Sequence, residues 1–148
     1  MRTLGIDFGE QRIGLAISDP AGRLAVPLCT LERRDDRGAA RQIARVALGE
    51  GVECLVLGEP LNLDGSRGEA AQRVRRFARR LERTTQLPLE LIGEALTSVE
   101  AEQRLRSAGA DLRKSPERID AVAAQILLQE ALDRRAAATT AEERTPED

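Results

Sequence analysis

Hydrophobic residues in the first thirty positions fall into three short runs separated by turn-forming residues. The runs cover residues 2–7, 13–18 and roughly 23–30, and the segments between them are Gly9–Arg12 and Asp19–Gly22. Runs of this length, bounded by glycine, proline and aspartate, are typical of β-strands joined by tight turns. The pattern therefore predicts an antiparallel meander of three strands.

After residue 35 the hydrophobic spacing changes to a helical period that alternates with two further apolar runs. Helices are predicted at 36–48, at 67–84, from Thr97 to Gly109 and from Pro116 to about Arg135. Ser66 with Glu69 and Thr97 with Glu100 have the spacing of capping boxes, and Ser115 before Pro116 is a typical helix start. The apolar runs at 52–57 and 87–93 are expected to be strands covered on both faces.

The order of these elements, βββαβαβαα, predicts an α/β fold with one mixed sheet. Strand–helix–strand units require right-handed crossovers and parallel pairing. The expected result is a mixed five-stranded sheet, with three antiparallel strands followed by parallel additions, flanked by helices on both faces. The length of 148 residues fits one domain. We assign residues 1–135 to that domain and expect 136–148 to be a disordered tail, because that segment is small, polar and charged.

The composition narrows the possible chemistry. The chain contains no histidine, which removes Ser-His-Asp and Cys-His catalysis and histidine metal sites. Its two cysteines, at 29 and 54, form no CxxC pair, so zinc binding is not expected. If the protein is an enzyme, its catalytic groups are therefore expected to be carboxylates, which favour binding of Mg²⁺ or Mn²⁺. Neither a signal peptide nor a membrane-spanning run is present, which predicts a cytoplasmic protein.

The net charge and the distribution of charge support opposite expectations about nucleic-acid binding. The net charge is −2, which argues mildly against a nucleic-acid partner, and aromatic residues are only 1% of the chain, which disfavours base stacking. The predicted helix at 67–84, however, has a basic outer face. That face could follow a phosphate backbone without reading sequence, although it could equally be a solvated surface. Its candidate substrate-binding residues are Arg76, Arg79, Arg80 and Arg83.

Asp7 is the first candidate for catalysis, because it follows an apolar stretch in a strand that should be central. Burying an unpaired carboxylate is costly, so Asp7 must be paired or must bind a metal. Pairing with Arg12, or a role in capping the following turn, is the structural alternative.

Glu94 and Asp120 are the other two candidates. Glu94 comes just after the predicted strand at 87–93, where open sheets bind ligands, although it could be an exposed loop residue. Asp120 lies on the flank of the apolar stripe of the last helix, where it could simply favour the helix N-terminus. Together with Asp7 they could converge at one rim of the sheet. Two divalent ions held there could stabilise both the attacking and the leaving oxygen of a phosphodiester.

Four ordered motifs give the chain a family resemblance. The motifs are Gly5–Asp19 (GIDFGEQRIGLAISD), Gly58–Gly65 (GEPLNLDG), Glu94–Ala101 (EALTSVEA) and Arg118–Leu128 (RIDAVAAQILL). In this order, across about residues 3–133, they resemble the YqgF/RuvX family.

The resemblance implies a ribonuclease-H-like fold and a nuclease that matures the 5′ end of pre-16S ribosomal RNA. The family is also similar to RuvC, which implies Holliday-junction cleavage in DNA repair as an alternative. It implies that Asp7, Glu94 and Asp120 bind Mg²⁺ or Mn²⁺ in a two-metal site and that the partner is structured RNA or branched DNA. Substrate contacts are expected from Arg12 and from the loop that contains Asn62, Asp64 and Gly65, as well as from the basic helix. A monomer or a homodimer is compatible with the sequence.

Two further classes of function stay open. The family usually has Asp-Glu-Arg where this chain has Gly93-Glu94-Ala95, which motivates a non-catalytic nucleic-acid-binding protein. The Gly-Ile-Asp-Xaa-Gly pattern also begins the phosphate loop of actin-type ATPases and sugar kinases. Those proteins close two such domains around a nucleotide, and 148 residues supply only one.

Overall fold

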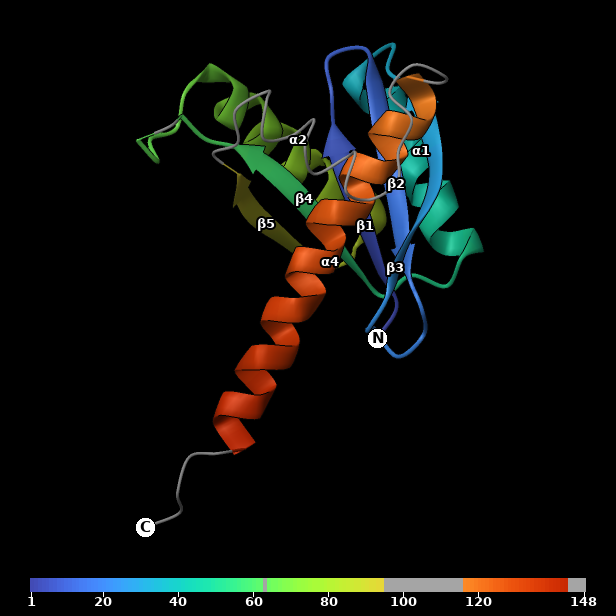
Figure 1. The fold of residues 1–148 in the computed structure, drawn as a ribbon. Coiled ribbons are helices and arrows are strands. Elements are labelled where there is room, and N and C mark those ends of the chain that lie inside the picture. Colours follow the sequence, from blue (N-terminus) through green and yellow to red (C-terminus); the bar gives the residue numbers. More distant parts are fainter. Residues whose placement is uncertain (63, 95–115, 144–148) are drawn as a thin grey trace.

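A computed structural model describes residues 1–62, 64–94 and 116–143 of the chain (Figure 1). The strands are β1 (Thr3–Phe8), β2 (Arg12–Ser18), β3 (Ala25–Glu32), β4 (Cys54–Pro60) and β5 (Leu89–Glu94). The helices are α1 (Asp36–Gly49), α2 (Glu69–Thr85) and α4 (Pro116–Glu143).

The five strands form one sheet in the order β3-β2-β1-β4-β5. β1 pairs antiparallel with β2, and β2 pairs antiparallel with β3, so the predicted meander is confirmed. β4 joins the other edge of β1 in parallel, and β5 joins β4 in parallel. The mixed five-stranded sheet is therefore as predicted, and β1, which contains Asp7, is its central strand.

Helices cover both faces of the sheet, with α1 and α2 on one side and α4 on the other (Figure 1). Side chains alternate between the faces along each strand. Leu4 and Ile6 of β1 pack into the core beneath α1 and α2. Val56 of β4 and Ile92 of β5 pack with Leu128 of α4 in a second core on the opposite face.

The last helix is longer than the sequence pattern predicts. We expected it to end near Arg135 and a disordered tail to begin at 136, but α4 continues to Glu143, so that expectation is wrong for residues 136–143. Ala136–Ala138 are strong helix formers, and the Thr139 hydroxyl donates to the Arg135 carbonyl at 3.0 Å. Residues 144–148 lie outside the described part of the chain.

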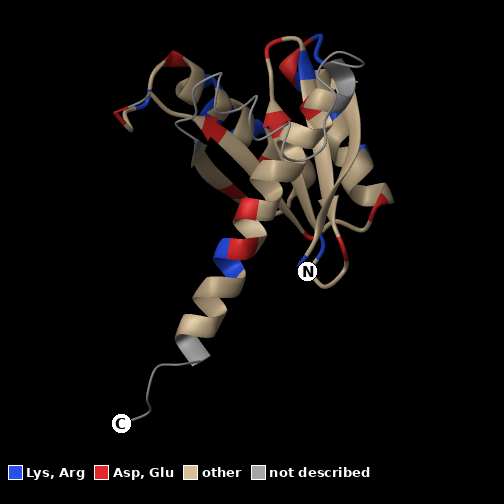
Figure 2. Cartoon of the chain, viewed as in Figure 1, with Lys and Arg blue, Asp and Glu red and all other residues tan. Residues whose placement is uncertain are grey.

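α4 extends beyond the sheet, with residues of both charges along its projecting half (Figures 1 and 2). It has 28 residues. Within the described part of the chain, no helix combines the length and the apolar character needed to cross a membrane.

The start of α2 differs from the prediction. α2 begins after Gly68 with no side-chain cap, so the predicted Ser66–Glu69 capping box is wrong. The Ser66 hydroxyl instead donates to Asp64 at 2.6 Å inside the preceding loop. The predicted helix from Thr97 to Gly109, and Ser115, lie outside the described residues.

Candidate active site

Asp7 lies near the carboxyl end of the central strand and faces α4. Its neighbours Ile6 and Phe8 pack on the α1–α2 side, so the alternation of β1 turns Asp7 to the opposite face. The Asp7 side chain is half-buried there, and its pairing partner in β2 is Gly14. The environment next to Asp7 is therefore decided by what packs over Gly14.

The backbone of α4 packs directly on Gly14. A Cβ atom added to Gly14 would lie 1.9 Å from the carbonyl oxygen of Asp120, a distance that no real side chain permits. Gly5 allows a second close approach, because its Cβ would lie 2.6 Å from the Cβ of Leu128. Since paired residues of antiparallel strands are about 5 Å apart, this contact places Asp120 next to Asp7. Two of the three predicted carboxylate residues thus come together from positions far apart in the sequence.

Asp120 forms an ion pair with Arg12. The Nε of Arg12 donates to Oδ2 of Asp120 at 2.8 Å, and the two side chains are 39% and 25% exposed. The sequence pattern named Arg12 as the alternative partner of Asp7 and did not predict its ion pair with Asp120. A partly exposed pair of this kind stabilises a protein by only about 0–1 kcal/mol, so either group can exchange it for another ligand at low cost.

Glu94 ends β5 at the same end of the sheet. It pairs with Pro60 at the end of β4, two positions beyond Ile92, which packs towards α4. Leu57 of β4 is the register partner of Ile6, so the next residue, Gly58, lies level with Asp7. Gly58 in turn pairs with Ile92 of β5. The backbone of β5 therefore reaches two residues, or about 6.6 Å, past the level of Asp7. The side chain of Glu94 lies outside the described residues.

A family model described as RuvX, Holliday junction resolvase, matches residues 1–134. The chain belongs to the RuvX family. A relative from Anaeromyxobacter sp. (strain K) is 46% identical over 92% of this chain and 99% of its own length, and one from Chloroflexus aggregans is 46% identical over 89% and 93%. Both relatives bear the name "Putative pre-16S rRNA nuclease".

Two solved structures share the fold of this chain. Thermus thermophilus RuvC in complex with a Holliday junction substrate superposes with a TM-score of 0.58 at 18% identity, covering 93% of this chain and 96% of RuvC. The fowlpox virus Holliday junction resolvase gives a TM-score of 0.60 at 13% identity, covering 90% and 99%. These similarities confirm the ribonuclease-H-like fold.

The second RuvX-like motif forms a compact turn at the end of β4. The hydroxyl and the backbone N–H of Ser66 both donate to Asp64, which holds the pKa of that carboxyl below its ordinary value. The Asn62 amide donates to the Ser66 hydroxyl at 3.0 Å, and Gly65 has a φ of +84°, which favours glycine. Asn62, Asp64 and Gly65 therefore build the turn itself, and substrate contact through them stays a prediction.

Gly93 packs closely against the loop that follows β4. A Cβ atom at Gly93 would lie 2.7 Å from Cδ1 of Leu61. A larger side chain therefore requires Leu61, in the neighbouring loop, to move.

The basic helix lies on the other face of the sheet. All four predicted substrate-binding arginines are exposed on α2, which packs on the side of the sheet opposite α4: Arg76, Arg79, Arg80 and Arg83. The structure does not bring them together with Asp7 and Asp120. A role in binding the same substrate would require a nucleic acid that reaches around the molecule.

Sequence reasoning missed a buried carboxylate, Glu59, inside the second motif. Glu59 is only 4% exposed and receives hydrogen bonds from Arg75 of α2 and from Arg67. The hydrogen bond from Arg75, ahead of the nearby positive charges, holds the pKa of Glu59 below its ordinary value of 4.5 despite the burial. The signal was the same as at Asp7: an acidic residue at the end of an apolar strand.

Replacing Glu59 with Gln is expected to lower the free energy of unfolding by about 2 kcal/mol near neutral pH, because it weakens charge-assisted hydrogen bonds in a buried position. A carboxyl whose pKa falls on folding adds stability above its unfolded pKa and loses it as the pH falls through the folded value. The difference between wild type and Glu59→Gln should therefore shrink below about pH 4.5. Urea denaturation at pH 7 and at acidic pH measures it.

Glu130→Gln is the matched control, because Glu130 pairs with Arg134 on the exposed side of α4. Such a pair should change stability by no more than about 0.5 kcal/mol. Equal effects of the two substitutions at pH 7 would contradict a special role for Glu59.

The donor set at the end of the sheet consists of oxygen ligands. Among the side chains that the structure describes, no three acidic or cysteine residues gather into a metal site. Asp7 and Asp120 supply two carboxylates at adjacent positions, and such ligands suit hard divalent cations. The described part of the site is therefore compatible with Mg²⁺ or Mn²⁺.

Proposed function

We propose that this protein is a metal-dependent nuclease that hydrolyses phosphodiester bonds, with Asp7, Glu94 and Asp120 as its catalytic metal ligands. The main support is the contact of α4 with Gly14, which brings Asp7 and Asp120 together at one end of the sheet. A second support is the fold, which this chain shares with solved structures of Holliday junction resolvases.

The chemistry of the site follows from its carboxylates. Mg²⁺ or Mn²⁺, when bound, would activate water and stabilise the leaving oxygen. Asp7 would hold its ligand position through the rigid central strand. Asp120 would exchange its ion pair with Arg12 for the cation, and the guanidinium of Arg12 would then be available to a phosphate oxygen.

The proposed substrate is the 5′ end of pre-16S ribosomal RNA. Its support is the name of relatives that are 46% identical over nearly their full length. Cleavage of branched DNA is the second candidate, favoured by the description of the family model. The cytoplasmic location expected from the sequence stays a prediction.

The test is a cleavage panel. Labelled precursor rRNA ends, an unrelated structured RNA and a four-way DNA junction are each incubated with the wild-type protein and Mg²⁺, Mn²⁺ or EDTA. Metal-dependent cleavage of the precursor ends, stronger than that of the junction, is the expected result. Preferential cleavage of the junction would reverse the order of the two substrates. Binding without cleavage in either metal would instead favour a non-catalytic protein.

A further inference from the structure

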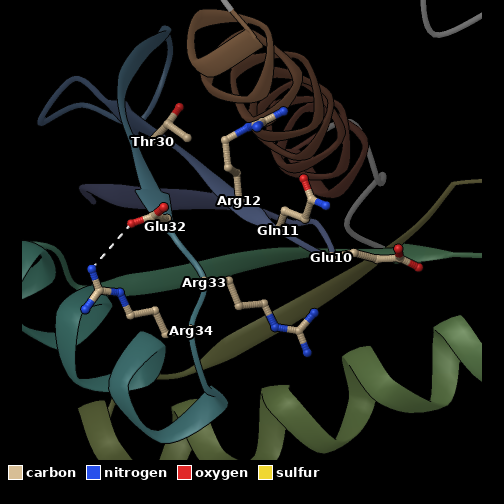
Figure 3. A pocket seen from close by; sticks show the side chains of 7 residues that line it. All are labelled: Glu10, Gln11, Arg12, Thr30, Glu32, Arg33 and Arg34. Carbon is tan, nitrogen blue, oxygen red and sulfur yellow. Dashed lines mark ion pairs between the residues drawn. The ribbon is translucent and has the colours of Figure 1, made fainter.

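A polar pocket of about 600 Å³ lies beside the candidate active site, between the β1–β2 turn and the end of β3 (Figure 3). Its walls are residues 10–12 of the turn, Thr30 and Glu32 of β3, and Arg33 and Arg34 of the following segment. We propose that this pocket binds the phosphodiester backbone that flanks the bond held at Asp7 and Asp120, with Arg12 and Arg34 as its anion-binding groups. This inference rests on the proposed nuclease function.

The position of Arg12 connects the two sites. Arg12 forms one wall of the pocket, and its Nε also pairs with Asp120 of α4. Figure 3 shows the Arg12 side chain directed towards the helix that carries Asp120. A nucleic-acid strand that meets the two carboxylates can therefore continue past Arg12 into the pocket.

The ion pair between Arg34 and Glu32 in the pocket is weak enough for a phosphate to replace the glutamate. Arg34 lies 3.7 Å from Glu32, and the two side chains are 86% and 76% exposed. A pair this exposed contributes little, so a phosphate can take the place of the glutamate. Arg12 begins β2 and Arg34 lies in the segment after β3. The two arginines therefore reach the pocket from different segments, which suits an extended anion better than a single small ion.

The lining favours the backbone of a nucleic acid over its bases. Three arginines, two glutamates, a glutamine and a threonine line the pocket, whereas no aromatic ring does. Base recognition in single strands depends mainly on aromatic stacking. Phosphate contacts position a strand without reading its sequence. The occupant is therefore expected to bind independently of base identity.

Arg33 fixes the pocket to the strand that carries Asp7. Its guanidinium lies over the ring of Phe8 at 4.1 Å, and that ring stacks on Phe77. The Arg33 side chain also donates to the carbonyl of Gly9, and the Arg33 backbone N–H donates to the carbonyl of Gln11. The spacing between the pocket and Asp7 is thus set by packing and hydrogen bonds, as a positioning site requires.

The experiment measures binding without cleavage. The full chain is titrated in EDTA with a labelled single-stranded RNA and with a four-way DNA junction, at several salt concentrations. Arg34→Gln should weaken the binding of the preferred probe about 3–10-fold. It should also make the plot of the log of the association constant against the log of the salt concentration less steep by about 1, because one phosphate contact is lost. Arg34→Lys should retain most of that slope. Arg45→Gln, an exposed site on α1 outside the pocket, should match the wild type.

Equal affinities and slopes for Arg34→Gln, Arg45→Gln and the wild type would overturn the pocket proposal. So would a large loss in Arg79→Gln with none in Arg34→Gln, because binding would then use the α2 face. The nuclease proposal is tested separately by cleavage of the same probes with Asp7→Asn. If that variant still cleaves, the nuclease site is wrong, whereas the EDTA titration still decides whether Arg34 binds nucleic acid.

Discussion

Replacing Asp7 with Asn is expected to lower metal-dependent cleavage by about a thousandfold or more. The amide has nearly the same shape as the carboxylate but no charge, so it is a poor ligand for a hard cation. Loss of a metal that stabilises charge in the transition state costs several kcal/mol, and about 4 kcal/mol corresponds to a thousandfold in rate. Single-turnover cleavage with excess protein measures this effect without a contribution from product release.

The fold should survive this substitution. Asp7 is half-buried in the central strand, and the neutral amide is easier to bury than a carboxylate. Denaturation should therefore show little loss of stability. Asp133→Asn makes the same chemical change at an exposed position of α4 and should leave cleavage unchanged. Wild-type cleavage rates in Asp7→Asn would remove Asp7 from the proposed catalytic site.

The architecture of the sheet was predictable because it depends on local patterns. Short apolar runs with turn residues between them predicted the meander of β1, β2 and β3, and the helical period predicted α1 and α2. The position of Asp7 in an otherwise apolar run was visible in the sequence for the same reason. These signals arise within a few residues of one another and need no knowledge of tertiary contacts.

The partners of the site residues were not predictable in this way. The ion pair between Arg12 and Asp120 joins residues more than a hundred positions apart in the sequence. That pairing depends on where α4 crosses the sheet, and no local pattern contains this information. Glu59 was overlooked although it showed the same signal as Asp7, and its burial became evident only with Arg75 placed over it.

The largest expected effect on the fold comes from Gly14→Ala. The added methyl group would lie 1.9 Å from the carbonyl oxygen and 2.3 Å from the carbonyl carbon of Asp120. Both are backbone atoms, so no change of rotamer relieves the clash, and α4 must move away from β2. That movement opens the core around Leu127 and Leu128. Overpacking of this kind costs about 1–3 kcal/mol, and the backbone contact places Gly14→Ala at the upper end of the range.

Urea denaturation of Gly14→Ala measures this cost, with Gly49→Ala as its control. Gly49 ends α1, and outside its own helical turn no atom of the described residues lies within 4 Å of a Cβ added there. Alanine at this position should therefore be neutral or slightly stabilising. Gly14→Ala should also cleave more slowly under conditions where circular dichroism shows it folded, because Asp120 moves with α4 while Asp7 stays in the sheet. Wild-type stability in Gly14→Ala would mean that α4 does not touch β2 at this point. The geometric basis for placing Asp7 beside Asp120 would then be lost, since that placement depends on the same contact.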